Sequence, residues 1–297
     1  MAATDYSIWS FCYARGRLPK DFMGGCPVCS NQGMVDIPMV YSLITSAPSA
    51  AGRRAILVDC GFKSGHSMTG RKFENFETPS QVLAKVDLRP GDIDTLVLTH
   101  LHFDHAGNFD AFPNARIVVQ RREYERWGEV IRDLPDVALG KEHWAVSSMD
   151  VEAYARISSA VETAKVELIE GDVEIAEGIH CRLAADTHTF GSQWVEVATP
   201  DGPHVVAGDC VYWYSNVERM WPPGYVQGNT WNVVGTYQRL RNVVGNDRLH
   251  RIVPGHDMEI FSRHPSWTVN GNPVAEIHLA AGEKQRGQAQ INGARLN

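Results

Sequence analysis

Short apolar runs separated by Gly, Pro and Asp turns recur along the chain and predict a protein rich in buried strands. The expected strands are 35–45, 54–60, 93–98, 115–120, 165–169, 173–175, 180–184, 194–198, 203–207 and 251–253. The turn at 199–202 indicates a hairpin between two of these strands, and a second hairpin is expected between 35–45 and 54–60.

Three stretches have the pattern of helices rather than strands. Residues 79–85 follow a Thr78 cap, 121–160 are polar and helix-prone with breaks near Pro135 and Gly140, and 230–244 form a third helix. Strands dominate each half of the chain, with helices between them. This arrangement suits two sheets packed face to face with helices outside, although other α/β layouts fit the same pattern.

The ends of the chain lack clear periodicity. Residues 1 to about 35 mix aromatic, basic, Gly and Pro positions and predict an irregular arm, while the polar stretch 282–297 predicts a flexible tail. Neither an internal repeat nor a long linker interrupts 1–297, so a single domain is expected.

Composition and charge argue against several classes of binding partner. The formal charge is −7 without a basic run, which argues against nucleic acid and anionic membranes. No apolar run reaches about 18 residues, as a membrane span requires. The first residues lack the pattern of a secretory signal, so a cytoplasmic location is expected. Six cysteines are too few for a disulfide scaffold of this length, and the Cys26–Cys29 pair suits a structural or incidental role, a local metal or a disulfide.

The strongest chemical signal lies at Thr99–Gly107, directly after the apolar run 93–98. Three histidines and one aspartate fall within positions 100–105. On a continued strand His105 would face away from the other three, so the four side chains converge only if the backbone bends there. Imidazole and carboxylate together favour zinc or a similar ion over calcium or magnesium.

Three further loops place a histidine or aspartate after a predicted strand: His188 follows 180–184, Asp209 follows 203–207, and His256 follows 251–253. The remaining seven histidines lie beside charged or turn residues, and we expect none of them to bind metal. They are His66, His143, His180, His204, His250, His264 and His278.

The stretch His-Leu-His-Phe-Asp-His-Ala-Gly at 100–107 resembles the His-x-His-x-Asp-His signature of the metallo-β-lactamase superfamily, and its wording is especially similar to the N-acyl homoserine lactonases. The resemblance implies an αββα sandwich of two mixed β-sheets flanked by helices, with the metal site along one edge. It also implies two zinc ions. His100, His102 and His188 would bind the first, Asp104, His105 and His256 the second, and Asp209 would bridge them.

By the same resemblance, Asp104, Asp209 and Tyr212 are the expected catalytic residues. A metal-bridging hydroxide would attack a lactone carbonyl, Asp209 would carry a proton to the leaving group, and Tyr212 would donate a hydrogen bond to the oxyanion. Tyr212 is otherwise a core aromatic. Asp59 would support the metal loop, or it is a turn-forming carboxylate.

The sequence does not decide which type of bond is cleaved or which substrate carries it. Acyl homoserine lactones and small aromatic or heterocyclic lactones are the leading substrates. The alternatives are a thioesterase, another ester or amide hydrolase, and an iron-dependent redox enzyme. A nuclease is disfavoured, because the chain lacks the basic surface signal that binding of nucleic acid requires. The aromatic residues at 212–214, 221–225 and 231 are typical of a pocket wall, of internal packing or of a homodimer interface.

Overall fold

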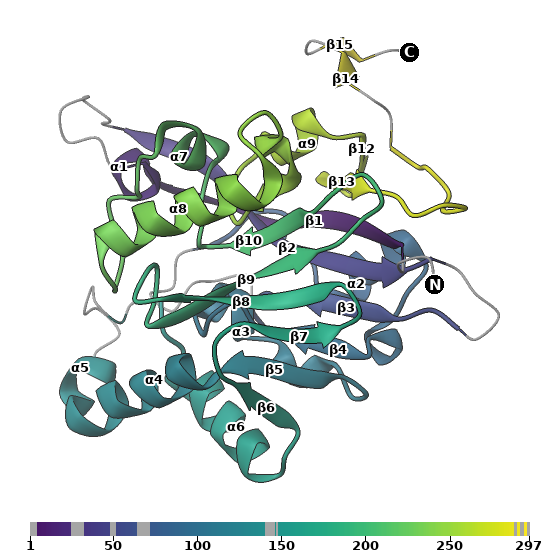
Figure 1. Ribbon diagram of the computed structural model, residues 1–297. Helices are drawn as coiled ribbons and strands as arrows, with labels where there is room; N and C mark the ends of the chain where they lie inside the picture. The colour runs from purple at the N-terminus through teal and green to yellow at the C-terminus, as the bar shows by residue number, and fades with distance from the viewer. Residues whose placement is uncertain are drawn as a thin grey trace.

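Two β-sheets pack face to face with helices on their outer sides, forming the expected αββα sandwich (Figure 1). The computed structural model describes residues 5–24, 33–47, 52–63, 72–139, 146, 148–287, 290–291 and 294–295. Within these residues, no helix combines the length and the apolar character that crossing a membrane requires.

The larger sheet has eight strands in the order β12-β13-β1-β2-β3-β4-β5-β6. Neighbours are antiparallel from β12 to β3 and parallel from β3 to β6. The strands are β1 Tyr6–Pro19, β2 Met34–Ser46, β3 Ala55–Val58, β4 Thr95–Val97, β5 Arg116–Gln120, β6 Val166–Ile169, β12 Ser266–Val269 and β13 Asn272–His278.

The smaller sheet has five strands in the order β11-β10-β9-β8-β7. Only β10 and β11 run parallel, so both sheets are mixed, as expected. The strands are β7 Val173–Ala176, β8 Ile179–Ala185, β9 Gly191–Val197, β10 His204–Gly208 and β11 Ile252–Pro254, and a separate two-stranded ribbon joins β14 Gln290–Ile291 to β15 Ala294–Arg295.

Helices cover both outer faces. The α-helices are α1 Lys20–Met23, α2 Pro79–Leu83, α3 Phe103–Ala106, α4 Arg121–Asp133, α5 Pro135–Leu139, α6 Val151–Glu162, α7 Tyr214–Arg219, α8 Thr230–Val244 and α9 Ile260–Arg263. Short 3-10 turns occur at Ala84–Val86, Pro90–Asp92, Phe109–Ala111 and Leu249–Arg251. Thr78 caps α2 as expected, in a reciprocal capping box with Gln81.

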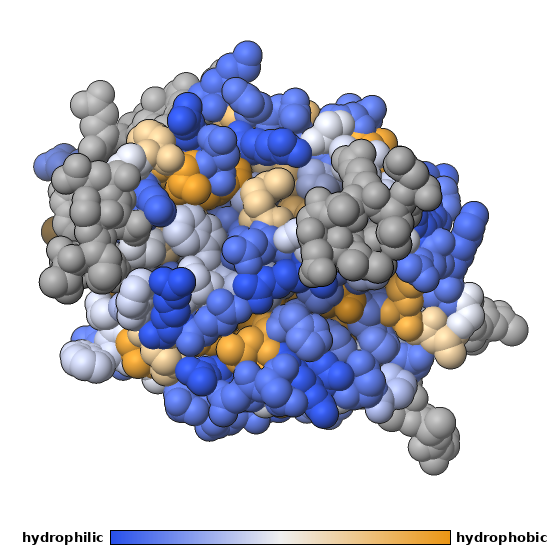
Figure 2. Space-filling model, turned by 90° about the horizontal axis from the view of Figure 1, so that it is seen from above, coloured by the Kyte–Doolittle hydropathy of each residue, from blue (hydrophilic) through white to orange (hydrophobic). Residues whose placement is uncertain are grey.

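Side chains alternate across the strands and divide the core into three layers. In β2, Val40 and Ile44 enter the layer between the two sheets, whereas Tyr41 and Leu43 face the helices outside the larger sheet. A third cluster, which includes Trp194 of β9 and residues of α8, covers the outer face of the smaller sheet. On the face seen in Figure 2, hydrophobic residues form several small groups among hydrophilic ones.

The prediction of an irregular arm over 1–35 is wrong for most of that stretch. Residues 6–19 form β1, which pairs with β2 along its length and with β13 on its other side. Residues 6–14 are all buried, on both faces of the strand, so the alternation that marks a half-buried strand is absent. Cys26 and Cys29 lie outside the described residues.

Arg286 and Gly287, which precede β14, pack on the body of the protein. The backbone N–H groups of Arg286 and Gly287 donate to the Glu276 carboxylate, and Arg286 also pairs with Asp87. The start of the expected flexible tail therefore has specific contacts. Most of the stretch after Gly287 lies outside the described residues.

Candidate metal centre

The four loops that carry the expected ligands meet at one edge of the sandwich. His100 and His102 follow β4, His188 lies between β8 and β9, Asp209 follows β10, and His256 follows β11. The bend that the sequence requires is supplied by α3, which begins at Phe103 directly after His102 and turns Asp104 and His105 back toward the other ligands.

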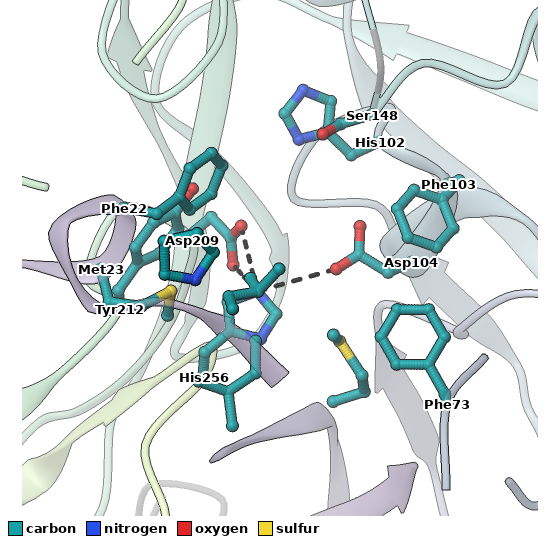
Figure 3. A pocket seen from close by; sticks show the side chains of 14 residues that line it. Phe22, Met23, Phe73, His102, Phe103, Asp104, Ser148, Asp209, Tyr212 and His256 are labelled. Atoms are coloured by element: carbon teal, nitrogen blue, oxygen red, sulfur yellow. Dashed lines mark hydrogen bonds and ion pairs between the residues drawn. The ribbon is translucent and has the colours of Figure 1, made fainter. Parts of the chain in front are cut away.

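All seven expected ligands come together in two adjoining groups. One ligand atom from each of His100, His102, His188 and Asp209 lies within 4.8 Å of the others, and the same holds for Asp104, His105 and His256. Asp209 contacts members of both groups, and Figure 3 shows its carboxylate beside His256. Its Oδ2 is 3.2 Å from His188 Nε2, and its Oδ1 is 3.2 Å from His105 Nε2 and 3.1 Å from His256 Nε2.

Several of these ligand atoms have no hydrogen-bond partner outside the centre. His100 Nε2, His105 Nε2 and Asp209 Oδ1 are buried and, apart from the close contacts among the candidate ligands themselves, have no hydrogen-bond partner among the described residues. Leaving a buried polar group unpaired costs about 1–3 kcal/mol. Metal ions among these atoms would remove that cost, and the donor set of imidazoles and carboxylates is the one that zinc prefers. The residues therefore fit two zinc-type ions.

The electrostatics of the first group keep its imidazoles in the form that binds metal. Burial lowers the pKa of His102 to about 4 and that of His188 to about 3, and it holds the pKa of His100 well below the usual value. All three are neutral at pH 7. Burial opposes ionisation of Asp209, but His256 and His105 outweigh it and hold the Asp209 pKa well below its ordinary range.

Hydrogen bonds from the surrounding chain decide which ring nitrogen faces the centre. His105 Nδ1 pairs with Asp59, His256 Nδ1 lies 3.0 Å from the Pro38 carbonyl, and His102 Nε2 lies 2.9 Å from Gln227 Oε1. Such partners fix the tautomer and orientation of metal-binding histidines. The Asp59 contact matches the supporting role that the resemblance implies. No motif in the sequence indicates Gln227 or the Pro38 carbonyl.

A cavity of about 280 Å³ opens directly onto this centre. Its polar wall consists of His102, Asp104, Ser148, Asp209, Tyr212 and His256. The rest of the wall is apolar, and it consists of Leu18, Pro19, Phe22, Met23, Ile37, Met39, Phe73 and Phe103. In Figure 3, Phe22, Met23 and Tyr212 face Phe73 and Phe103 across the Asp104 and Asp209 carboxylates.

Tyr212 is buried, and its hydroxyl lies 3.2 Å from His188 Nδ1. Burial raises the pKa of this phenol well above its usual value, so it stays protonated. A neutral imidazole that binds an ion through Nε2 carries its proton on Nδ1. His188 then donates to the Tyr212 oxygen, which leaves the phenolic hydrogen free to donate to another acceptor.

The other aromatic residues of this region divide into two sets. The Tyr225 ring stacks on Phe22 at a centroid separation of 5.1 Å, behind the cavity wall. Trp221 and Trp231 are 38% and 80% exposed and do not line the cavity. Among the aromatic residues at 212–214, 221–225 and 231, Tyr212 is thus the one that lines the cavity, whereas Trp213 donates from Nε1 to the His256 backbone carbonyl.

Where the structure describes them, the histidines that were not expected to bind metal do not join this centre. His66 and His143 lie outside the described residues. His204 and His278 gather with Asp201 in a separate group. The Asp201 carboxylate already pairs with Arg251 there, at 3.0 Å. A guanidinium in that position neutralises the carboxylate and disfavours a second cation.

The sequence matches the model of the metallo-beta-lactamase superfamily over residues 43–256. An N-acyl homoserine lactonase from Bacillus sp is 28% identical over 179 residues, which are 60% of this chain and 61% of the relative. N-acyl homoserine lactonase AiiA from Bacillus thuringiensis subsp. kurstaki matches to the same extent. The chain thus spans less than two thirds of the length of these relatives. A further N-acyl homoserine lactonase, from Bacillus cereus, is 26% identical over 216 residues, 72% of this chain and 75% of the relative.

Solved structures resemble the fold over nearly the whole chain. A quorum-quenching N-acyl homoserine lactone lactonase superposes with a TM-score of 0.65 at 24% identity, covering 87% of this chain and 95% of the other. The hydrolase AbOPH superposes with a TM-score of 0.62 at 17% identity, covering 95% and 99%.

Proposed function

Because the chain belongs to the metallo-beta-lactamase superfamily, we propose that it is a metal-dependent hydrolase that opens a lactone ring with two zinc ions. One observation carries the proposal: Asp209 belongs to one group of buried ligand atoms and contacts His105 and His256 of the other, and both groups open onto one cavity. His100, His102 and His188 would hold one ion, Asp104, His105 and His256 would hold the other, and Asp209 would be available to either. When bound, such ions supply a hydroxide nucleophile at neutral pH and polarise the carbonyl.

The protein's own groups complete the reaction. Tyr212 lines the cavity, and its free phenolic hydrogen donates to the carbonyl oxygen as negative charge develops there. The carboxylate of Asp209 reaches the same space and carries the proton of the newly formed carboxylic acid to the alkoxide that leaves when the ring opens, so that the product is a carboxylate with a free hydroxyl. Asp104, the second carboxylate that lines the cavity, would be a ligand of the second ion.

The cavity wall supports a neutral substrate with an apolar body. Among the described residues that line it, no lysine or arginine is present to bind a phosphate or a free carboxylate. Aromatic rings of Phe22, Phe73 and Phe103 suit either an acyl chain or a flat ring system. We therefore propose an acyl homoserine lactone or a small aromatic or heterocyclic lactone, and the name of the relatives favours the former.

A substrate panel with metal analysis tests this function. Purified protein is assayed on acyl homoserine lactones, aromatic lactones, acyl thioesters and phosphodiesters, and its metal content is measured in parallel. We expect close to two zinc ions per chain and turnover of a lactone, with both reduced in Asp209→Ala. His180→Ala, which changes a histidine outside the centre, is the matched control. Turnover confined to thioesters or phosphodiesters would contradict the proposal.

A further inference from the structure

Glu123, the third residue of α4, is a carboxylate with no exposed surface, and each of its oxygens serves a different metal loop. Its Oε1 accepts hydrogen bonds from the Leu101 backbone N–H at 3.0 Å and from Trp127 Nε1 at 2.9 Å. Its Oε2 accepts from Thr189 Oγ1 at 2.8 Å and from the Gly191 backbone N–H at 2.7 Å. One side chain thus connects the loop after β4 to the loop between β8 and β9.

The positions of these donors relate Glu123 to one group of ligands. Leu101 lies between His100 and His102, and Thr189 directly follows His188. The two loops come from different sheets and have no covalent reason to keep a fixed separation. The second group has other supports, since His105 contacts Asp59 and His256 contacts the Pro38 carbonyl.

The contacts favour a carboxylate at this position, because the Leu101 N–H, Trp127 Nε1–H and Gly191 N–H can only donate. All four partners of Glu123 are neutral donors, so no opposite charge offsets its burial. Burying a charge without a counter-ion is costly, and a side chain that served only packing would be apolar. The backbone at Gly191 also lies close to α4. A Cβ at Gly191 would lie 2.4 Å from the Glu123 backbone nitrogen, so only glycine permits this close packing.

We infer that Glu123 is a positioning residue for the ion held by His100, His102 and His188. By joining the two loops, it sets the distance between the imidazoles that arrive from the two sheets. It does not touch the substrate cavity, and its removal affects the first ion while leaving the second in place. This inference rests on the proposed two-ion centre.

Glu123→Gln tests the inference in two backgrounds that each retain one group of histidines. The amide has the size of the carboxylate, but its NH2 group replaces an oxygen that accepts two hydrogen bonds. It therefore faces a backbone N–H group that can only donate. In His256→Ala, which keeps the first group whole, we expect Glu123→Gln to lower zinc affinity about 10- to 100-fold, as the loss of such supporting contacts does. In His188→Ala, which keeps Asp104, His105 and His256, we expect no change. Affinity is measured by competition with a chromophoric chelator.

The matched control is Glu77→Gln, because Glu77 is also a buried carboxylate but pairs with Lys85 and Asn272. It is expected to reduce stability and leave both affinities unchanged. If Glu123→Gln does not fold, Thr189→Val removes one donor to Oε2 and is expected to weaken the first ion to a smaller extent. Equal losses in the two backgrounds, or no loss in the first, overturn the inference. Wild-type protein that binds no zinc contradicts the proposed function itself.

Discussion

His105 Nδ1 lies 2.7 Å from Asp59 Oδ2, and this contact aims the opposite nitrogen of the ring at Asp209, 3.2 Å away. The same carboxylate accepts hydrogen bonds from the backbone N–H and the hydroxyl of Thr99, the residue before the first histidine of the motif. One aspartate at the end of β3 therefore orients a candidate ligand and anchors the loop that supplies three others.

Asp59→Asn is expected to weaken the second zinc ion about 10- to 100-fold, since the amide is a poorer acceptor for His105. Asp59 has a φ of 65°, a left-handed conformation that asparagine tolerates, so the backbone is retained. Chelator competition in the His188→Ala background measures the affinity. Asp87→Asn is the control, because Asp87 has a φ of 62° and lies at an exposed position. An unchanged affinity would count against the supporting role of Asp59.

Tyr212→Phe is expected to lower kcat and kcat/KM together, by about 10²–10³, while metal content stays the same. The reason is the loss of a hydrogen-bond donor that acts as charge develops on the carbonyl oxygen. Steady-state kinetics and elemental analysis check this. The control is Tyr237→Phe, which removes a buried hydroxyl that has no partner among the described residues. If Tyr212→Phe keeps both wild-type constants, Tyr212 is a packing residue.

Removing the metal is expected to destabilise the fold, because the ions bind the folded centre and not the unfolded chain. Each site adds about 2.7 kcal/mol to the free energy of unfolding when free zinc is 100 times its Kd. Differential scanning calorimetry with and without chelator measures the loss. Restoring zinc, but not magnesium, should restore the midpoint. A midpoint that does not depend on metal is incompatible with the centre proposed above.

Cys210→Ala is expected to retain most turnover, even though Cys210 adjoins Asp209. Burial raises the pKa of this thiol well above its usual value, so it is neutral and cannot act as a nucleophile. Kinetics of the variant on a lactone substrate provide the measurement. Loss of most activity with normal metal content would point to a thiol mechanism instead of hydroxide attack.

His264 is expected to make the protein acid-sensitive independently of the metal centre. Burial, followed by the charge of His250, lowers its pKa to about 4 from an ordinary value of 6.5. Between these values the unfolded chain binds a proton that the folded protein does not. The free energy of unfolding therefore falls as pH drops through this range, by about 3 kcal/mol in total. Urea unfolding of metal-free protein at pH 7 and pH 4.5 should show a smaller difference in His264→Gln than in wild type.

Much of the fold is predictable because its elements have local signals. The helix expected at 230–244 coincides with α8, and the expected strands from 35–45 onward correspond to strands of the two sheets. The pair β12–β13 was not predicted, although Asn270 and Gly271 between them have φ angles of 52° and 82°, as a two-residue hairpin turn requires. That Asn-Gly signal was present in the sequence.

The candidate ligands were predictable for a different reason, because each follows a strand and carries a side chain that binds metal. What the sequence does not reveal is how they are held. Gln227 lies 125 positions after His102, and Pro38 lies 218 positions before His256. Such contacts depend on the tertiary arrangement of distant segments, and a glutamine side chain or a backbone carbonyl has no motif of its own.

Most of the apolar cavity wall comes from a part of the chain that precedes the candidate ligands. All seven ligands lie within 43–256, the stretch that matches the family, whereas Leu18, Pro19, Phe22, Met23, Ile37 and Met39 precede it. Most of the apolar wall is thus encoded ahead of that stretch, while Phe73 and Phe103 lie within it. Substitutions at these six wall positions can retune which molecule is accepted, but the segment as a whole cannot be exchanged freely, because its Pro38 carbonyl orients the candidate ligand His256.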